Sequence, residues 1–201
     1  ERDWVPDQDV LFTKDLKFTW NEIYKLLEPY FDNSLPLLSQ VFLADLNGKL
    51  LHNMLPLYSK IHDYFQIKNI TPLLSKQLIS FATHLPIDQK YNHQNNVGKI
   101  LLLKLLEKYK TSPLISRKKQ GFSVDTLNLW NSCGKQLCEY YLDNARIVND
   151  NIINYEWIQK HIKKPDIDVR YVNKFLGLLA LEIWYRLHIT REMDENERLT
   201  V

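Results

Sequence analysis

The sequence contains little glycine. Five glycines occur in 201 residues, whereas the phosphate-binding loops of the Walker and dinucleotide types need several glycines within a few positions. Gly98 followed by Lys99 makes no such loop. The small number of glycines therefore argues against a nucleotide site built on a glycine-rich loop in this chain.

Cysteine is also scarce. Cys133 and Cys138 are the two cysteines, and a spacing of five within a predicted helix turns them to different faces, which suits neither a disulfide nor C-x-x-C metal binding. We expect two half-buried, hydrophobic cysteines. The six histidines form no H-E-x-x-H motif, and no G-x-S-x-G elbow is present, so a metal site and a serine nucleophile both lack support.

Long hydrophobic runs and an excess of one charge are missing as well. The apolar runs at 99–106 and 175–184 are interrupted by charge before the roughly 20 residues that a membrane span needs. No signal peptide pattern opens the chain. The formal net charge is +2, too balanced for binding nucleic acid through the overall field. We therefore expect a cytoplasmic protein with neither a membrane nor a nucleic acid as partner.

Apolar residues, by contrast, are plentiful and follow a helical period. They make up 45% of the chain, enough for a real core, and they recur three and four positions apart nearly everywhere. Sustained alternation of the strand type is hard to find, so the sequence predicts an all-α fold. The predicted helices are 19–30, 35–54, 56–65, 74–84, 98–110, 132–144, 152–163 and 170–188.

The last predicted helix combines an apolar face with two charged residues. Glu182 and Arg186 are four residues apart, the spacing of a surface ion pair. A purely structural role accounts for this pattern. We expect a core helix with a supporting ion pair and a buried indole at Trp184. The polar, Asn-rich segment 87–97 predicts an exposed connection, and 191–201 predicts a charged, frayed tail.

The stretch Arg117-Lys118-Lys119-Gln120-Gly121-Phe122 places three cations in a predicted loop. It reads either as a solvated basic loop or as an anion site, in which a fixed ammonium stabilises negative charge that develops on phosphate oxygens. Composition alone leaves the two interpretations level.

A resemblance to a known family favours the second interpretation. The stretch resembles the R-x-K-Q-G-F loop of the asparagine synthase family, and Lys99 lies where the family has the lysine of its G-x-K-x-x-L-R helix. Trp130 is similar to the tryptophan after the family's loop. Residues 70–91 resemble its R-V-P-F-L-D and A-x-x-L-P segments, matching at Pro72, Leu74, Leu78, Phe81, Ala82, Leu85, Pro86 and Lys90. The closing L-W-x-L-L-x-L-E-x-W-x-R helix of the family matches at Leu179, Leu181, Glu182, Trp184 and Arg186.

The resemblance covers roughly residues 41–190, leaving 1–40 as an unassigned N-terminal helical segment. It implies an ATP-dependent amide-forming synthetase in which an acid is adenylated, pyrophosphate leaves, and an amine attacks the acyl-adenylate. Lys119 would be catalytic. The implied contacts to ATP or pyrophosphate are Arg117, Lys119, Gln120, Gly121 and Lys99.

The departures from the family pattern are equally informative. Its pyrophosphate-binding S-G-G-x-D-S loop and its G-E-G-x-D-E segment are absent. The resemblance thus implies the helical C-terminal part of an adenine-nucleotide-alpha-hydrolase-like (PP-loop ATP pyrophosphatase) α/β synthetase domain without its sheet half. ATP and Mg²⁺ are expected only in the completed domain. The expected partner is the nucleotide-binding half, as a preceding segment or a separate subunit, with a glutaminase domain as a further candidate.

Several family positions carry other residues here. The D-R-M-S segment aligns with 59–62, a glutamate and an arginine with Lys68 and Ile70, and an aspartate with Ser75. Replacing a carboxylate by Lys68 reverses the local field. Two alternatives therefore stay open: a non-catalytic binding or regulatory module derived from the family, and a synthetase for a different carboxylate.

Overall fold

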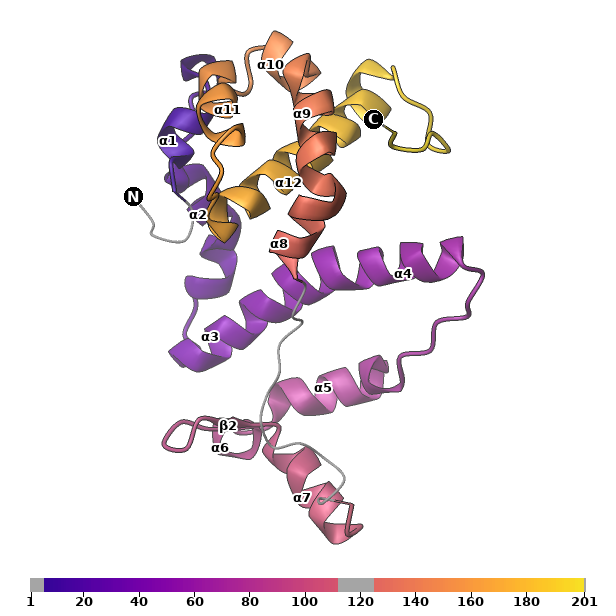
Figure 1. Ribbon diagram of the computed structural model, residues 1–201. Helices are drawn as coiled ribbons and strands as arrows, with labels where there is room; N and C mark the ends of the chain where they lie inside the picture. Colours follow the sequence, from indigo (N-terminus) through magenta and orange to yellow (C-terminus); the bar gives the residue numbers. More distant parts are fainter. Residues whose placement is uncertain (1–5, 112–124, 201) are drawn as a thin grey trace. The chain divides into compact units, whose positions relative to one another are not determined.

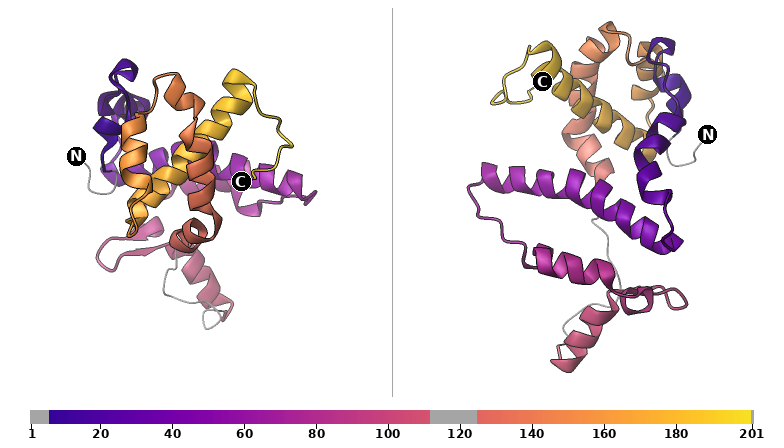
Figure 2. Two further views of the ribbon diagram at one scale, coloured as in Figure 1. Left: turned by 45° about the horizontal axis from the view of Figure 1, so that its top comes forward. Right: turned by 180° about the vertical axis from the view of Figure 1, so that it is seen from behind.

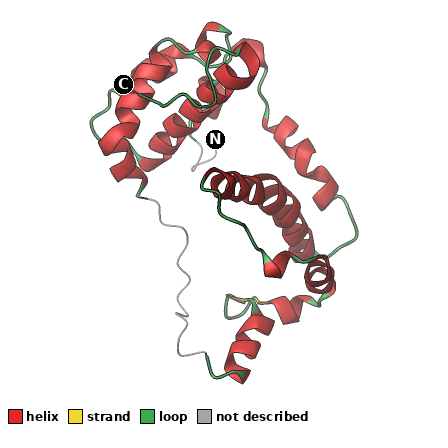
Figure 3. Cartoon of the chain, turned by 90° about the vertical axis from the view of Figure 1, so that its right-hand side faces the viewer, coloured by secondary structure: helices red, strands yellow, loops and turns green. Residues whose placement is uncertain are grey.

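The computed structural model describes residues 6–111 and 125–200 of the chain, and almost all of its regular structure is helical (Figures 1 and 3). The chain divides into two compact units. Unit 1 comprises residues 1–22 and 120–201, and unit 2 comprises 23–119. Within the described residues, no helix combines the length and the apolarity that crossing a bilayer requires.

Unit 1 joins a short N-terminal segment to a group of C-terminal helices. The N-terminal elements are α1 (Gln8–Leu11) and the 3₁₀ turn η1 (Lys14–Leu16). The C-terminal elements are α8 (Thr126–Leu129), the π-helical η5 (Trp130–Gly134), α9 (Lys135–Asp143), α10 (Arg146–Asn149), α11 (Tyr155–Ile162), α12 (Val169–Tyr185) and the π-helical η6 (Arg186–Thr190).

The C-terminal helices begin where the sequence offers capping side chains. The Asp125, Asn154 and Asp168 side chains each accept a hydrogen bond from a backbone N–H in the first turn of α8, α11 and α12. Such caps satisfy amides that the helix itself leaves unpaired. The caps and the intervening Pro165 therefore set the predicted separation between the last two helices.

Helices α9, α11 and α12 enclose the hydrophobic core, and α9 crosses α12 in both orientations of Figure 2. Trp130 and Phe175 pack with ring centroids 5.6 Å apart, and Phe175 also meets Trp157 at 5.3 Å. Cys138 lies in this core, where burial, with a smaller contribution from Glu139, raises the pKa of its thiol to about 12. Cys138 is thus a buried hydrophobic residue, more deeply buried than the half-buried position that the sequence predicted, whereas Cys133 is exposed.

A buried carboxylate joins α12 to the corner that follows α9. Glu182 is fully buried and accepts hydrogen bonds from the backbone N–H groups of Arg146 (2.9 Å) and Ile147 (3.0 Å). Arg186 Nε donates to the same carboxylate, and Arg186 Nη2 donates to the carbonyl oxygen of Asn144 at 3.2 Å. The expected ion pair between Glu182 and Arg186 forms, but its carboxylate lies in the core and not on the helix surface.

Unit 2 contains most of α2 and the elements that follow it. These are α2 (Trp20–Phe31), which begins in unit 1, α3 (Leu37–Ala44), the π-helical η2 (Asp45–Met54), α4 (Leu55–Tyr64), the 3₁₀ turn η3 (Pro72–Leu74), α5 (Lys76–His84), α6 (Ile87–Lys90), β1 (Tyr91–Asn92), β2 (Val97–Gly98) and α7 (Ile100–Lys108).

The segments α3, η2 and α4 form one continuous helical run, although the sequence predicted a break before Pro56. Ala44, Asp45, Met54 and Leu55 all have right-handed helical dihedrals. At the end of η2 the N–H of Leu55 donates to the carbonyl of Leu50, a π-type bond. A proline within a regular α-helix collides with the carbonyl four residues back. The wider π-helical winding precedes Pro56 and lets the run continue.

The Asn-rich segment 87–97 is more ordered than predicted. Tyr91 and Asn92 pair antiparallel with Gly98 and Val97. Within the turn, Asn92 Oδ1 accepts hydrogen bonds from the N–H groups of Gln94 (3.0 Å) and Asn95 (3.2 Å). Side chains of this type stabilise turns by imitating the backbone. Residues 93–97 are exposed, as predicted, whereas Tyr91 and Asn92 are half-buried, and the segment consists of α6 and this hairpin.

The prediction of an all-α chain is confirmed, since this two-stranded hairpin is the sole sheet among the described residues. The expected burial of Trp184 is wrong: this indole is 49% exposed, whereas Trp130 is 3% exposed. A helical period identifies a face but does not tell how much of that face a neighbouring element covers.

We expect Glu182→Gln to lower the free energy of unfolding of unit 1 by about 2–4 kcal/mol, because the amide presents N–H donors to a pocket lined by donors. Urea unfolding followed by tryptophan fluorescence measures the change. The matched control is Glu139→Gln, which removes an exposed carboxylate 3.9 Å from Lys135 Nζ and should cost less than about 0.5 kcal/mol. Equal losses in the two variants would contradict the assigned role of Glu182.

The two tryptophans provide a second comparison. Trp130→Ala should destabilise unit 1 by about 3–5 kcal/mol, since it leaves a cavity against Phe175. Trp184→Ala should lower the stability of unit 1 by less than half as much, because about half of the surface of this residue already faces solvent. Thermal unfolding monitored by circular dichroism tests the order. The expectation fails if Trp184→Ala is the more damaging change.

Candidate functional site

Most of the sequence-predicted site residues fall outside the described part of the chain. Arg117, Lys119, Gln120 and Gly121 belong to residues 112–124, which the structure does not describe. The division between the two units falls between Lys119 and Gln120. Their roles as catalytic and phosphate-contacting residues stay predictions.

The elements on either side of this segment end and begin at defined caps. Helix α7 ends with Lys110 in the left-handed conformation (φ 56°), while both the N–H and the Oγ1 of Thr111 donate to the carbonyl of Leu106 at 3.0 and 3.1 Å. These are the bonds of a C-terminal helix cap. Asp125 caps α8 on the other side, its carboxylate accepting from Asn128 N at 3.0 Å. In the sequence, the predicted loop therefore lies between two helix ends that are each capped locally.

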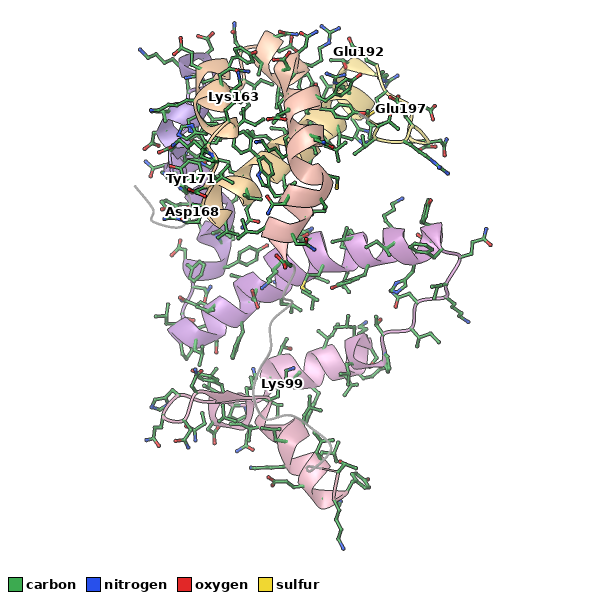
Figure 4. All side chains as sticks on the ribbon, viewed as in Figure 1. Lys99, Lys163, Asp168, Tyr171, Glu192 and Glu197 are labelled. Atoms are coloured by element: carbon green, nitrogen blue, oxygen red, sulfur yellow. The ribbon has the colours of Figure 1, made fainter. Side chains whose placement is uncertain are left out.

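Lys99 is the predicted site residue that the structure describes. It follows β2 and precedes α7, has φ 59°, and its carbonyl accepts the first helical bond of α7 from Leu103 N at 3.0 Å. Its side chain is exposed, and Figure 4 shows it at the start of α7. A cation at a helix N-terminus is unfavourable toward the helix dipole, and a left-handed conformation costs a residue with a Cβ about 1–2 kcal/mol.

This combination indicates what Lys99 can do. Helix stability does not explain a lysine at this position, because both its charge and its dihedral angles oppose it. An anion at the same place would be attracted by the ammonium and by the unpaired N–H groups of the first turn. The arrangement therefore suits contact with a phosphate, the role that the resemblance implies.

The hairpin and α7 also border a shallow hollow. Lys104 and Glu107 of α7 line it together with Asn92 and Asn95 of the hairpin. Lys99 is not part of its wall. With both charge signs on its walls, the hollow does not resemble a site for a polyphosphate.

The family positions that carry different residues lie on α4, α5 and the connection between them. Ser75 is the N-cap of α5, its Oγ accepting from Leu78 N at 3.3 Å. Lys68 and Ile70 are exposed in the connection. On α4, His62 Nδ1 is buried and has no hydrogen-bond partner. Ser75 thus performs the capping role that an aspartate would also perform.

The described residues contain no group of three or more His, Cys, Asp or Glu side chains placed to hold a metal ion. They do contain a polar cluster that the sequence did not predict. Asp7 accepts hydrogen bonds from Trp157 Nε1 (3.2 Å) and the Tyr171 hydroxyl (3.0 Å), and His161 Nε2 lies 3.4 Å from it. From the sequence, the spacing of four between Trp157 and His161 could have indicated that these two side chains meet on one helix face. No sequence pattern indicated that the distant Asp7 is their partner.

Comparison with known protein families gives one match. The model of the asparagine synthase family matches residues 12–186. No curated protein and no solved structure matches the chain. The family match begins before residue 41, the start of the resemblance described above, and includes the R-x-K-Q-G-F stretch, Lys99 and the closing helix.

Proposed function

Because the chain belongs to the asparagine synthase family, whose members are ligase-type enzymes, we propose that it supplies the helical part of an ATP-dependent amide-forming synthetase. The observation that carries the proposal is the complete R-x-K-Q-G-F stretch, Arg117 to Phe122, inside a family match over residues 12–186. The three cations of this stretch suit the reaction, because it develops negative charge on phosphate oxygens that cations stabilise.

The proposed reaction has two steps. A carboxylate oxygen of the acid attacks the α-phosphorus of ATP, the bond between the α- and β-phosphates breaks, and pyrophosphate leaves. The nitrogen of an amine then attacks the acyl carbon and loses a proton, the amide bond forms, the bond between the acyl carbon and the oxygen shared with the phosphate breaks, and AMP leaves with that oxygen. Negative charge grows on the departing pyrophosphate in the first step, and we assign its stabilisation to the Lys119 ammonium.

The other cations and the glycine would serve the same phosphates. Arg117 and Gln120 offer N–H donors, and Gly121 gives the loop backbone conformations that a residue with a Cβ avoids. Lys99 would contribute a second ammonium together with the first-turn amides of α7. The ligands of Mg²⁺ would come from ATP and from the partner.

A partner is supported by the surface of unit 2. Between residues 23 and 111 no residue is buried, although the helices there carry large apolar side chains. Exposed examples are Leu26, Leu37, Leu57, Phe65, Ile70, Leu73 and Phe81. Extensive exposed apolar surface indicates an interaction site. We assign it to the nucleotide-binding α/β half of the synthetase domain, carried by a preceding segment or a separate subunit, with a glutaminase domain as a further candidate partner.

A second candidate function follows from the altered positions. An exposed Lys68 replaces a carboxylate, and Ser75 replaces an aspartate while retaining the cap of α5. These changes alter the charge of the substrate region without disturbing the helices. They favour either a different carboxylate substrate or a non-catalytic scaffold over asparagine formation.

Pyrophosphate release separates these functions. The chain is isolated from its native cells with its companions, and Mg²⁺-ATP-dependent release is measured with aspartate and with a panel of other carboxylic acids, ammonia or glutamine being the amine. Release that depends on an acid supports the synthetase and identifies the acid. If the assembly contains an S-G-G-x-D-S polypeptide but no acid elicits release, the scaffold function replaces the proposal.

Within such an assembly, Lys119→Ala should lower turnover by about 100-fold or more, the effect of removing one charge-stabilising donor. The neighbouring Lys118→Ala removes an equal charge from the same loop and should change turnover only about twofold. Steady-state pyrophosphate release measures both. Equal losses in the two variants would assign the effect to the general field of the loop and overturn the specific role of Lys119.

Lys99→Asn tests the second cation. Asparagine tolerates the left-handed conformation, so the start of α7 is kept while the ammonium is lost. We expect the KM for ATP to rise about tenfold, the value of one charged hydrogen bond, with an unchanged helical signal in circular dichroism. Lys104→Gln on the same helix is the control and should leave the KM unchanged. A similar rise in both variants would refute a direct contact by Lys99.

A further inference from the structure

The N-terminal segment of unit 1 is bound to helices that lie more than 130 residues away in sequence. Residues 6–13, which we name the N-terminal strap, insert the buried Leu11 into the core. Asn154 N donates to Leu11 O at 2.9 Å, Thr13 N donates to Ile152 O at 3.1 Å, and Phe12 and Ile153 form an antiparallel bridge. The strap is thus attached by backbone bonds at one end.

At its other end the strap is attached by a charged cluster. Asp7, the N-cap of α1, accepts from Trp157 Nε1 and from the Tyr171 hydroxyl. The Trp157, His161 and Tyr171 rings stack, with centroids 4.6 Å apart for Trp157 and His161 and 5.1 Å apart for His161 and Tyr171. Tyr171 is labelled near the beginning of α12 in Figure 4, and α1 and α11 lie on that side of unit 1 in Figure 1.

His161 is buried, and both of its ring nitrogens face oxygen acceptors. Nδ1 lies 2.8 Å from the carbonyl oxygen of Trp157, and Nε2 lies 3.4 Å from Asp7 Oδ2. A neutral imidazole has one N–H, so when Nδ1–H donates to the carbonyl, Nε2 points a lone pair at the carboxylate. The imidazolium has two N–H groups and satisfies both acceptors. A proton at Nε2 therefore converts a repulsive contact into an ion pair.

We propose that His161 and Asp7 form a proton-operated latch that fastens the N-terminal strap to α11 and α12. The inference is independent of the proposed synthetase function. The latch is closed while Nε2 carries its proton and opens when that proton is removed, and the unperturbed charge change of histidine side chains in general falls between pH 5 and 8.

The other charged groups around the latch modify its strength without replacing it. Burial raises the pKa of Asp7. The hydrogen bonds from Trp157 and Tyr171 and the charges of His161 and Lys174 together lower it by more than burial raises it, so the pKa of Asp7 lies below its ordinary value. Asp7 thus stays ionised between pH 5 and 8. Its own contribution is lost only when the pH falls through that lowered pKa.

Two lysines lie close to the cluster. Lys174 Nζ donates to the carbonyl of Pro6 and to Gln8 Oε1 (3.1 Å) and lies 5.5 Å from the Trp157 ring centroid. Lys164 Nζ lies 5.7 Å from the Tyr171 ring centroid. The contacts of Lys174 keep the strap held in part once His161 is neutral. Opening therefore affects the strap and its Leu11, while we expect the packing among α9, α11 and α12 to persist.

Amide hydrogen exchange in the full chain tests the latch. Protection of the Thr13 and Asn154 amides, which bridge the strap to 152–154, is measured between pH 5 and 8 and corrected for the intrinsic exchange rate. We expect protection to fall about fivefold across this range, the value of one partly exposed ion pair. The Phe175 amide in α12 should show no such change. Strap protection that is constant with pH would overturn the proposal.

Asp7→Asn separates the latch from a general effect of pH. Asparagine accepts the left-handed dihedral of position 7 (φ 59°) and can still accept hydrogen bonds from Trp157 and Tyr171. The pH dependence of strap protection should disappear in this variant and persist in Asp15→Asn, which alters an exposed carboxylate of η1. A retained dependence in Asp7→Asn would refute the pairing.

A second measurement covers the case in which Asp7→Asn does not fold. The ¹⁵N resonances of the His161 ring in the unmodified chain report when Nε2 gains its proton. The proposal requires the loss of strap protection to coincide with the change in these resonances. Strap opening at a pH where the His161 resonances stay constant would exclude His161 as the operating group.

Discussion

The buried carboxylate of Glu182 is the interaction on which the arrangement of unit 1 depends. Its two oxygens bond the first amides of α10 and the guanidinium of Arg186. Because α10 has four residues, it is too short to be stable by itself, and its first amides need an acceptor. The carboxylate supplies it and, through Arg186 and the carbonyl of Asn144, fixes the corner between α9 and α10 against α12.

This constraint also explains why charge is tolerated in the core. A carboxylate without partners inside a protein costs several kcal/mol, but one with three donors at hydrogen-bond distance is compensated. Outside the core, Arg146 extends the same network, since its Nε donates to Glu192 Oε2 at 2.6 Å and the hydrogen bond raises the pKa of Arg146. The part of the tail around Glu192 is thereby tied to α10, although the sequence predicted a frayed end.

Features that a few neighbouring residues determine could be predicted from the sequence, whereas features that depend on distant parts of the chain could not. Helices with local caps, such as α12 after Asp168, were predictable, because an N-cap and an apolar period act within a few residues. The burial of Glu182 and the exposure of Trp184 were not, since they depend on elements some 35 residues away in the chain or on surfaces that no local pattern describes. The predicted break between helices 35–54 and 56–65 is absent for a related reason, because the π-helical winding of η2 lets the helical run continue past Pro56.

The candidate site follows the same division. Lys99 could be identified from its motif, and its left-handed backbone at the start of α7 is a local property. The strength with which the Lys99 ammonium stabilises negative charge depends on surroundings that its motif does not determine. An ammonium stabilises developing charge strongly only where water is excluded and the donor is held in place. Unit 1 encloses a core, whereas the described residues of unit 2 bury none of their side chains. In the proposed synthetase, the association that covers the apolar side chains of unit 2 would therefore also desolvate its cation, so that assembly and activation become one event.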